Sequence, residues 1–274
     1  MSIITISWGS FSSGVPLAEH VAERLGCRCV SRENLTEAAA KLGIPERKLS
    51  DLFERRPGFW ERLTESRERY ITFIRAAMYD LAQGPPMVYH GQGGQILLRE
   101  VSHALKVCMI APLEMRIGAL LQQGHPTRES AERYIQKVDE QRQQRIRDLF
   151  NVDWRDPGLY DVVVNMGNLS LDSAVDTIVN LAKQPEFQPT PASQKVLNDL
   201  TLAARVRVQL AVSTGDGLDF DVQADGGVVW LTGSTDGLDS SYLDQAVTIA
   251  NGVPGVTEVR FDLEPRPILP YLIQ

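Results

Sequence analysis

The 274-residue sequence has no excess of positive charge. It contains 28 Lys and Arg residues against 35 Asp and Glu, which gives a formal net charge of −7. General nucleic-acid-binding proteins usually carry a basic surface that neutralises phosphates, so this composition predicts no nucleic-acid partner. A local basic cluster for a small phosphorylated molecule is still compatible with the charge.

Long apolar runs are also missing. No stretch reaches the roughly 18 apolar residues that a membrane span requires. The N-terminus shows no basic segment followed by an apolar run and a cleavage site. We therefore expect no transmembrane segment and a cytoplasmic location.

Cysteine is scarce. The three cysteines are Cys27, Cys29 and Cys108. Their odd number and the absence of a zinc-type spacing predict reduced, structural thiols. We expect no metal site built on them.

What the sequence does contain is a regular alternation of apolar strands and helical segments. Short apolar runs at 3–7, 27–30, 87–90, 104–110 and 161–165 are separated by stretches with helical spacing. This order is typical of a parallel α/β sheet. We predict a five-stranded parallel sheet flanked by helices, occupying residues 1–184.

The pattern changes after residue 184. Residues 185–194 hold three prolines and no periodicity, and we interpret them as a linker. Residues 195–264 predict a small α+β domain, with an Asp225-Gly226-Gly227 turn between two strands. The apolar segment 265–274 is interpreted as a C-terminal tail.

The first strand leads into a loop of small residues and then a helix that we expect to begin near Pro16. Strand, glycine-rich loop and helix N-terminus form the layout of a phosphate-binding loop, because backbone N–H groups converge on an anion there. The motif GxxxxGK[ST] places Lys and then Ser or Thr after its last glycine. Here Val15 and Pro16 follow Gly14.

Residues 1–184 resemble the cytidylate kinase-like family of P-loop nucleoside monophosphate kinases. Several short motifs carry the resemblance through their order and spacing. They are 3–14 (IITISWGSFSSG), 31–33 (SRE), 90–93 (HGQG), 110–114 (IAPLE), Arg116, Asp139 with Arg142, 153–154 (DW) and 160–165.

This resemblance implies a set of site residues. The nucleotide- and phosphate-binding group comprises Gly9, Ser10, Phe11, Ser12, Ser13, Gly14 and Val15 in the loop, Arg32 after the second strand, and His90, Gly91, Gln92 and Gly93 after the third. The implied catalytic group comprises Arg116, Asp139 and Arg142. The family has Gly-Arg-Gly where this sequence has Gly91-Gln92-Gly93. An alternative interpretation of Arg116 and Arg142 is that they lie on solvated helix faces, with Asp139 and Arg142 paired at i,i+3.

Residues 195–264 resemble a BON domain. The similar segments are 229–233 (VWLTG) and 253–259 (VPGVTEV). The resemblance implies self-association or a protein partner.

Together these resemblances imply an ATP-dependent nucleoside monophosphate kinase with a CMP-like acceptor and a degenerate phosphate loop. ATP and Mg²⁺ are the implied cofactors, although the usual Mg²⁺ ligand is absent from the sequence. We expect activity that is weak or lost. The alternative is a non-catalytic sensor of a nucleotide or other anion, coupled to the BON-like domain for regulation or assembly.

Overall fold

The computed structural model describes residues 3–10, 14–42, 64–213, 220–234 and 240–264. The chain divides into two compact units, residues 1–197 and 198–274. Phe11, Ser12, Ser13 and the predicted tail 265–274 lie outside the described residues. The expected roles of these three loop residues and of the tail therefore stay predictions.

The first unit is built on a five-stranded parallel sheet, which confirms the predicted fold class. Its strands are β1 (Ile3–Trp8), β2 (Arg28–Ser31), β3 (Met87–His90), β4 (Ala104–Ile110) and β5 (Val162–Asn165). Their order is β2-β3-β1-β4-β5, and every pairing is parallel. The carboxyl ends of all five strands therefore meet at one edge, where ligands bind in open α/β sheets.

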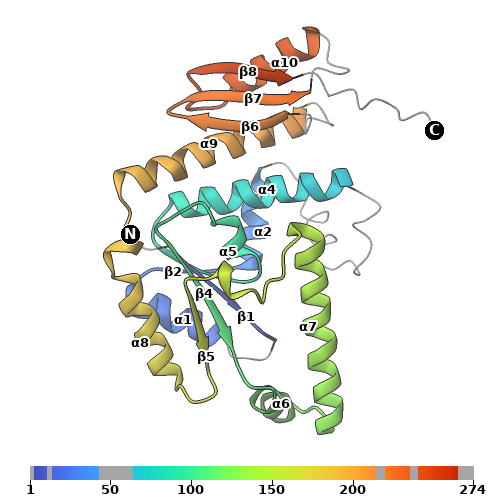
Figure 1. The fold of residues 1–274 in the computed structure, drawn as a ribbon, viewed down its shortest axis with the longest axis vertical. Coiled ribbons are helices and arrows are strands. Elements are labelled where there is room, and N and C mark those ends of the chain that lie inside the picture. Colours follow the sequence, from blue (N-terminus) through green and yellow to red (C-terminus); the bar gives the residue numbers. More distant parts are fainter. Residues whose placement is uncertain (1–2, 11–13, 43–63, 214–219, 235–239, 265–274) are drawn as a thin grey trace, which may run out of the picture. The chain divides into compact units, whose positions relative to one another are not determined.

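Helices cover both faces of this sheet (Figure 1). They are α1 (Gly14–Leu25), α2 (Arg32–Lys41), α4 (Thr64–Gln83), α5 (Gly94–Leu97), α6 (Leu113–Gln122), α7 (Arg128–Phe150) and α8 (Leu171–Ala182), with the 3-10 turns η2 (Pro157–Leu159) and η3 (Pro185–Phe187). On one face α1 and α8 pack against Ile4, Ile6 and Val107, all fully buried. Helix α1 begins two residues before the predicted Pro16, so Gly14 belongs to the helix.

The opposite face of the sheet carries a polar chain beneath the loop 153–160. Ser7 Oγ donates to Gln95 Oε1 at 2.8 Å, Gln95 Nε2 donates to the Tyr160 hydroxyl at 2.9 Å, and that hydroxyl donates to the Trp154 carbonyl at 2.6 Å. Gln95 is 2% exposed. These three hydrogen bonds hold the Tyr160 hydroxyl and the Trp154 carbonyl against the sheet.

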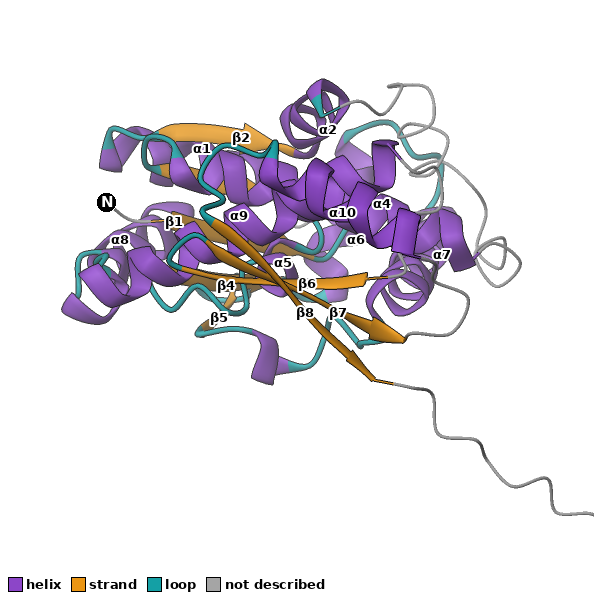
Figure 2. Ribbon diagram, turned by 90° about the horizontal axis from the view of Figure 1, so that it is seen from above, coloured by secondary structure: helices purple, strands orange, loops and turns teal. Residues whose placement is uncertain are grey.

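The second unit contains a three-stranded sheet with helices, as the composition of 195–264 predicted. Helix α9 (Pro191–Ser213) leads into β6 (Phe220–Asp225), β7 (Val228–Ser234), α10 (Ser240–Asn251) and β8 (Glu258–Glu264). The three strands lie side by side in Figure 1, and Figure 2 shows them from above. Strands β6 and β7 pair antiparallel, and β7 and β8 pair parallel. Gly226 and Gly227 have φ values of 59° and 96°, which explains the two glycines in the predicted hairpin turn.

The stretch predicted as a linker is partly helical. Residues 185–187 form η3, and α9 begins at Pro191, inside the predicted linker 185–194. Both elements start with a proline in their first turn, where its missing N–H is not needed. Within the described ranges, no helix combines the length and the apolar character that crossing a membrane requires.

His103 makes stability depend on pH. The residue is 2% exposed, and burial lowers the pKa of its imidazole, with Lys106 adding to the effect. In the unfolded chain its pKa is near 6.5, so the unfolded state binds more protons below that pH. The contribution of His103 to the free energy of unfolding is therefore fully present above its unfolded pKa and is lost as the pH falls below about 6.5.

We predict that the free energy of unfolding, measured by urea titration, falls between about pH 7 and pH 5.5. His103→Gln should flatten this dependence, because it removes a group that titrates differently in the two states. His20→Gln, at an exposed position, is the matched control. An unchanged slope in His103→Gln would contradict the assignment.

Candidate functional site

The described part of the phosphate loop lies at the carboxyl edge of the sheet. Gly9 follows β1, and its N–H donates to the carbonyl of Met109 at 3.3 Å. Ser10 is 1% exposed. The loop therefore leaves the sheet between β1 and β4, where the strand order reverses, and this is the position at which such sheets bind ligands.

Gly14 is a glycine because the Trp8 indole lies against it. A Cβ atom at residue 14 would stand 2.1 Å from Cδ2 of Trp8, far inside van der Waals contact. The same indole lies beside His90, with ring centroids 5.7 Å apart. The glycine thus allows an aromatic side chain between the start of α1 and the end of β3.

The next three residues replace the usual charged part of the loop. Val15 and Pro16 are exposed, whereas Leu17 is fully buried in the core. None of the three side chains has an oxygen or a nitrogen. These residues do not fit a Mg²⁺ ion, which requires oxygen ligands.

Arg116 and Asp139 converge on Ser10. The Arg116 guanidinium donates to the Ser10 carbonyl at 2.7 Å, to the Ser10 hydroxyl at 2.6 Å and to Asp139 Oδ2 at 2.6 Å. The hydroxyl of Ser10 donates to Asp139 Oδ1 at 2.6 Å, and the backbone N–H of Ser10 donates to the same oxygen at 3.4 Å. The Asp139 carboxylate, from α7, therefore accepts hydrogen bonds from the N–H and the hydroxyl of Ser10 in the phosphate loop.

A second group of cations lines a neighbouring cavity of about 330 Å³. Its walls include Val15, Arg32, His90, Gly91, Gln92, Arg142 and Arg145. Burial lowers the pKa of Arg142; Asp139 opposes this effect, while Arg116, Arg145 and Arg32 reinforce it. Burial and Arg32 likewise lower the pKa of Arg145. The positively charged guanidinium groups that line this cavity therefore repel one another.

His90 and Glu33 lie at the same cavity. Burial lowers the pKa of the His90 imidazole, although Glu33 and Glu19 act in the opposite direction. Since an unperturbed imidazole titrates near 6.5, His90 is neutral at pH 7. It therefore presents a neutral ring and not an additional cation.

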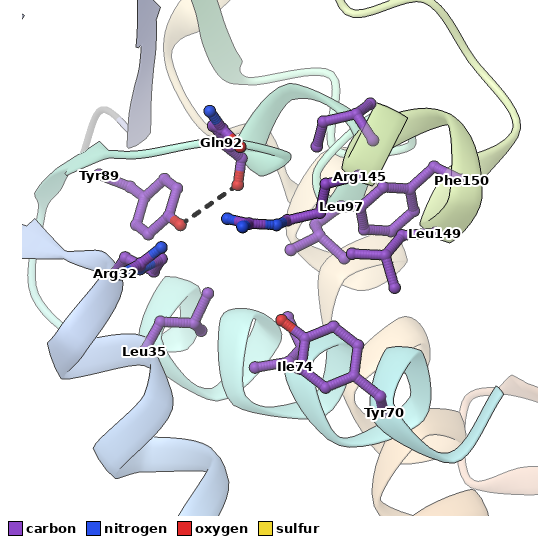
Figure 3. A pocket seen from close by; sticks show the side chains of 11 residues that line it. Arg32, Leu35, Tyr70, Ile74, Tyr89, Gln92, Leu97, Arg145, Leu149 and Phe150 are labelled. Carbon is purple, nitrogen blue, oxygen red and sulfur yellow. Dashed lines mark hydrogen bonds between the residues drawn. The ribbon is translucent and has the colours of Figure 1, made fainter. Parts of the chain in front are cut away.

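A much smaller cavity of about 20 Å³, shown in Figure 3, shares Arg32, Gln92 and Arg145 with the cavity of about 330 Å³. The side chains of Arg32 and Arg145 point toward it from opposite sides, and the ring of Tyr70 lies below them. Tyr89 donates to the carbonyl of Gln92 at 3.5 Å. Leu35, Ile74, Leu149 and Phe150 complete an apolar lining.

The structure brings together some of the predicted site residues and separates others. Arg32, His90, Gly91, Gln92, Val15 and Arg142 share the 330 Å³ cavity. Arg116 and Asp139 instead join Gly9 at a different cavity of about 570 Å³. Gly93 has a φ of 84° and forms the N-terminal cap of α5, so its role in the structure is to shape the turn after β3.

The alternative pairing of Asp139 with Arg142 is not the one observed. Asp139 forms its ion pair with Arg116, while Arg142 donates to the carbonyl of Trp8 at 3.1 Å. Arg145 was missed as a site residue. Its position three residues after Arg142 on α7 puts both on one helix face, and this spacing was the available signal.

The model of the cytidylate kinase-like family matches residues 3–168 of the chain. The chain belongs to the cytidylate kinase-like family. This match ends before the second unit, so the BON resemblance of residues 195–264 receives no support from it. No curated protein sequence matches this cytidylate kinase-like chain.

Solved structures similar to this cytidylate kinase-like chain include two bacterial proteins. An uncharacterized protein from Eubacterium ventriosum shares 19% identity with a TM-score of 0.51, over 66% of this chain and 97% of that one. A shikimate kinase from Bacteroides thetaiotaomicron shares 12% identity with a TM-score of 0.40, over 67% of this chain and 99% of that one. The similarity to the Eubacterium ventriosum protein supports the fold of this chain, and neither structure identifies a substrate.

Gly14→Ala should destabilise this cytidylate kinase-like chain by about 1–3 kcal/mol, because the added methyl group forces the Trp8 indole out of its place. Gly118→Ala in α6 is the control, since a Cβ there meets nothing within 4 Å. It should be neutral or stabilising by up to about 1 kcal/mol. Chemical denaturation of both variants measures the difference, and equal stabilities would refute the packing argument.

Proposed function

We propose that this chain binds nucleotides through their phosphates at the carboxyl edge of its first sheet, with phosphoryl transfer that is weak or lost. Membership of the cytidylate kinase-like family supports a nucleotide ligand. The observation that carries the proposal is the cavity lined by Arg32, Arg142 and Arg145 beside the phosphate loop.

The charge of this cavity favours a phosphorylated acceptor. Three guanidinium groups share it, and burial together with neighbouring cations lowers the pKa of two of them. A bound phosphate would reduce this repulsion and accept paired N–H bonds from the planar guanidinium groups. The acceptor in the family resemblance is CMP, and we propose a CMP-like nucleotide for this cavity.

The same geometry argues for reduced catalysis. Phosphoryl transfer depends on positive charge placed around the transferred group. Val15, Pro16 and Gln92 stand where the family resemblance implies a loop cation, a hydroxyl for Mg²⁺ and an acceptor-side arginine. Removing a single preorganised contact typically costs about 3–4 kcal/mol of transition-state stabilisation. The loss of three such contacts would make turnover low or absent.

A second candidate function is a non-catalytic sensor. Val15 lines the arginine cavity with 40% of its surface exposed, at the position where a catalytic loop would place its cation. In this candidate, Arg116, Asp139 and Arg142 serve binding and not transfer. The second unit, by its resemblance to a BON domain, would pass the nucleotide signal to a partner or a second copy of the chain.

Calorimetric titration of the full chain with CMP tests the binding site. Arg145→Gln should weaken CMP binding about tenfold or more, because a hydrogen bond to a charged group is worth about 1.5–3 kcal/mol. Arg147→Gln removes an exposed arginine from the same helix and should leave the affinity unchanged. Equal affinities in the two variants, or no heat with wild-type protein, would argue against the proposal.

Turnover separates the two candidate functions. An assay of CMP-dependent ADP release from ATP should give little or no signal with wild-type protein. If transfer is limited by the missing loop cation, Val15→Lys should raise it. CMP binding without turnover in either protein would favour the sensor.

A further inference from the structure

The three-stranded sheet of the second unit has an open edge at β8. Its strand order is β6-β7-β8, and within the described residues β8 pairs with β7 alone. Figure 1 shows β8 as the outer strand of this sheet. In a parallel ladder, alternate residues direct their N–H and C=O groups to the neighbouring strand, and the others direct theirs away. The outer side of β8 therefore presents a row of backbone donors and acceptors.

The backbone of β8 is long and regular for an edge strand. Its seven residues, Glu258–Glu264, include no proline. Its register with β7 is continuous along the whole strand, which excludes a bulge. By contrast β2 and β5, the edge strands of the first sheet, have only four residues each. Long, regular edges are templates on which a strand of another chain can pair.

One face of β8 carries an apolar row of side chains. Val259 and Leu263 pack against the core of the second unit, and Phe261 lies between them on the same face. The Phe261 ring is 6.0 Å from the Phe220 ring, measured between centroids, yet Phe261 is 37% exposed. The core of the unit therefore covers this aromatic side chain only in part.

The other face of β8 carries a charged row, Glu258, Arg260 and Asp262. Arg260 donates to both carboxylate oxygens of Glu258, at 2.7 and 3.0 Å, and 53% of the Arg260 side chain is exposed. Asp262 is also exposed. Opposite charges therefore stand two residues apart on an accessible strand.

This pattern is self-complementary in an antiparallel pairing about a two-fold axis at Phe261. Arg260 then lies opposite Asp262 of the second copy, and Asp262 lies opposite Arg260 of that copy. On the apolar face the two Phe261 side chains lie opposite each other, and Val259 lies opposite Leu263. Opposite charges and aromatic pairs directly across two strands each stabilise a sheet.

Other registers lack this complementarity. An axis at Arg260 places two guanidinium groups opposite each other, and an axis at Asp262 places two carboxylates opposite each other. An axis nearer either end of β8 leaves part of the strand without a partner. A slip by one residue would put the apolar row opposite the charged row.

The opposite edge of the same sheet, β6, does not match itself in this way. The strand carries Asp221 and Asp225 and has no cation. Its apolar side chains are already covered, since Phe220 is 0% exposed and Val222 is 9% exposed. Strand β6 therefore offers a second copy neither a complementary charge nor an apolar surface.

We propose that β8 of one copy of the chain pairs antiparallel with β8 of a second copy about a two-fold axis at Phe261, joining the two small sheets into one. This inference goes beyond the proposed nucleotide binding and does not depend on it. The charges on β8 oppose pairing with unrelated strands and match only the same strand. Because each copy uses the edge once, the assembly closes as a dimer.

The size of the contact sets the expected affinity. Seven paired residues span about 23 Å. Two strands of this length bury less than the roughly 1,200 Å² that marks the lower end of stable interfaces. We therefore expect a reversible dimer with a dissociation constant in about the micromolar range.

Sedimentation equilibrium of the full chain, from about 1 to 300 µM, tests the pairing. Wild-type protein should show a monomer–dimer equilibrium. Arg260→Glu and Asp262→Arg each place like charges opposite each other, and each should weaken the dimer about tenfold or more. Both variants should fold, because exposed ion pairs contribute little to stability, and thermal melts check this. Arg155→Glu is the matched control: Arg155 pairs with Asp153 in the same way, is 58% exposed and lies in the first unit.

An equal mixture of the Arg260→Glu and Asp262→Arg proteins tests the register. In a mixed dimer, position 260 of the first variant and position 262 of the second carry opposite charges, and the remaining wild-type pair is also complementary. The mixture should therefore regain about the wild-type dimer affinity, although each variant alone does not.

Four results would overturn the inference. They are a wild-type protein that stays monomeric over the whole range, assemblies larger than a dimer, a mixture that stays monomeric, and a dimer that Arg155→Glu weakens as much as Arg260→Glu does. Assemblies larger than a dimer would indicate pairing of β6 with β8, which does not close.

Discussion

The contact of Ser10 with Arg116 and Asp139 is the interaction on which the rest of the site depends. It joins three elements that are far apart in the sequence: the phosphate loop, α6 and α7. The pair is only partly exposed, with 13% of the Arg116 side chain and 31% of the Asp139 side chain accessible. Breaking one partner of such a pair leaves a charge without compensation. An incoming phosphate would supply Arg116 with another anion in place of the carboxylate.

This contact also arranges the two cavities. With α7 held against the loop at Asp139, the helix presents Arg142 and Arg145 to the cavity near Val15, and Gln136, Glu140 and Gln143 to the cavity near Gly9. Arg142 adds a second connection through the carbonyl of Trp8. One helix therefore lines both cavities, and movement of α7 away from Ser10 would alter both at once. Such coupling is expected when a single rigid element lines two sites.

The fold could be predicted from the sequence because its strands are short, continuous apolar runs, such as 104–110, which parallel sheets bury on both faces. The candidate site was harder to predict from the sequence. Arg32, His90 and Arg142 line one cavity with Val15 of the loop, and strand ends and family motifs locate them there, while their roles stay predictions. The partner of Asp139 was not predictable, since Arg116 and Arg142 both carry the required charge and only the packing of α6 against α7 chooses between them. The 570 Å³ cavity had no sequence signal, because exposed Ile110 and Val163 look like ordinary strand residues.

We infer that an internal carboxylate occupies the phosphate site of the loop until a nucleotide binds. The most direct test is the distance between Ser10 Oγ and Asp139 Oδ1 in a crystal structure of the full chain with bound ATP. In the structure that distance is 2.6 Å. The account predicts that it exceeds hydrogen-bonding range, with a phosphate oxygen on Ser10 and Arg116 in place of the carboxylate. A nucleotide bound elsewhere, with the Ser10–Asp139 hydrogen bond intact, would contradict the account.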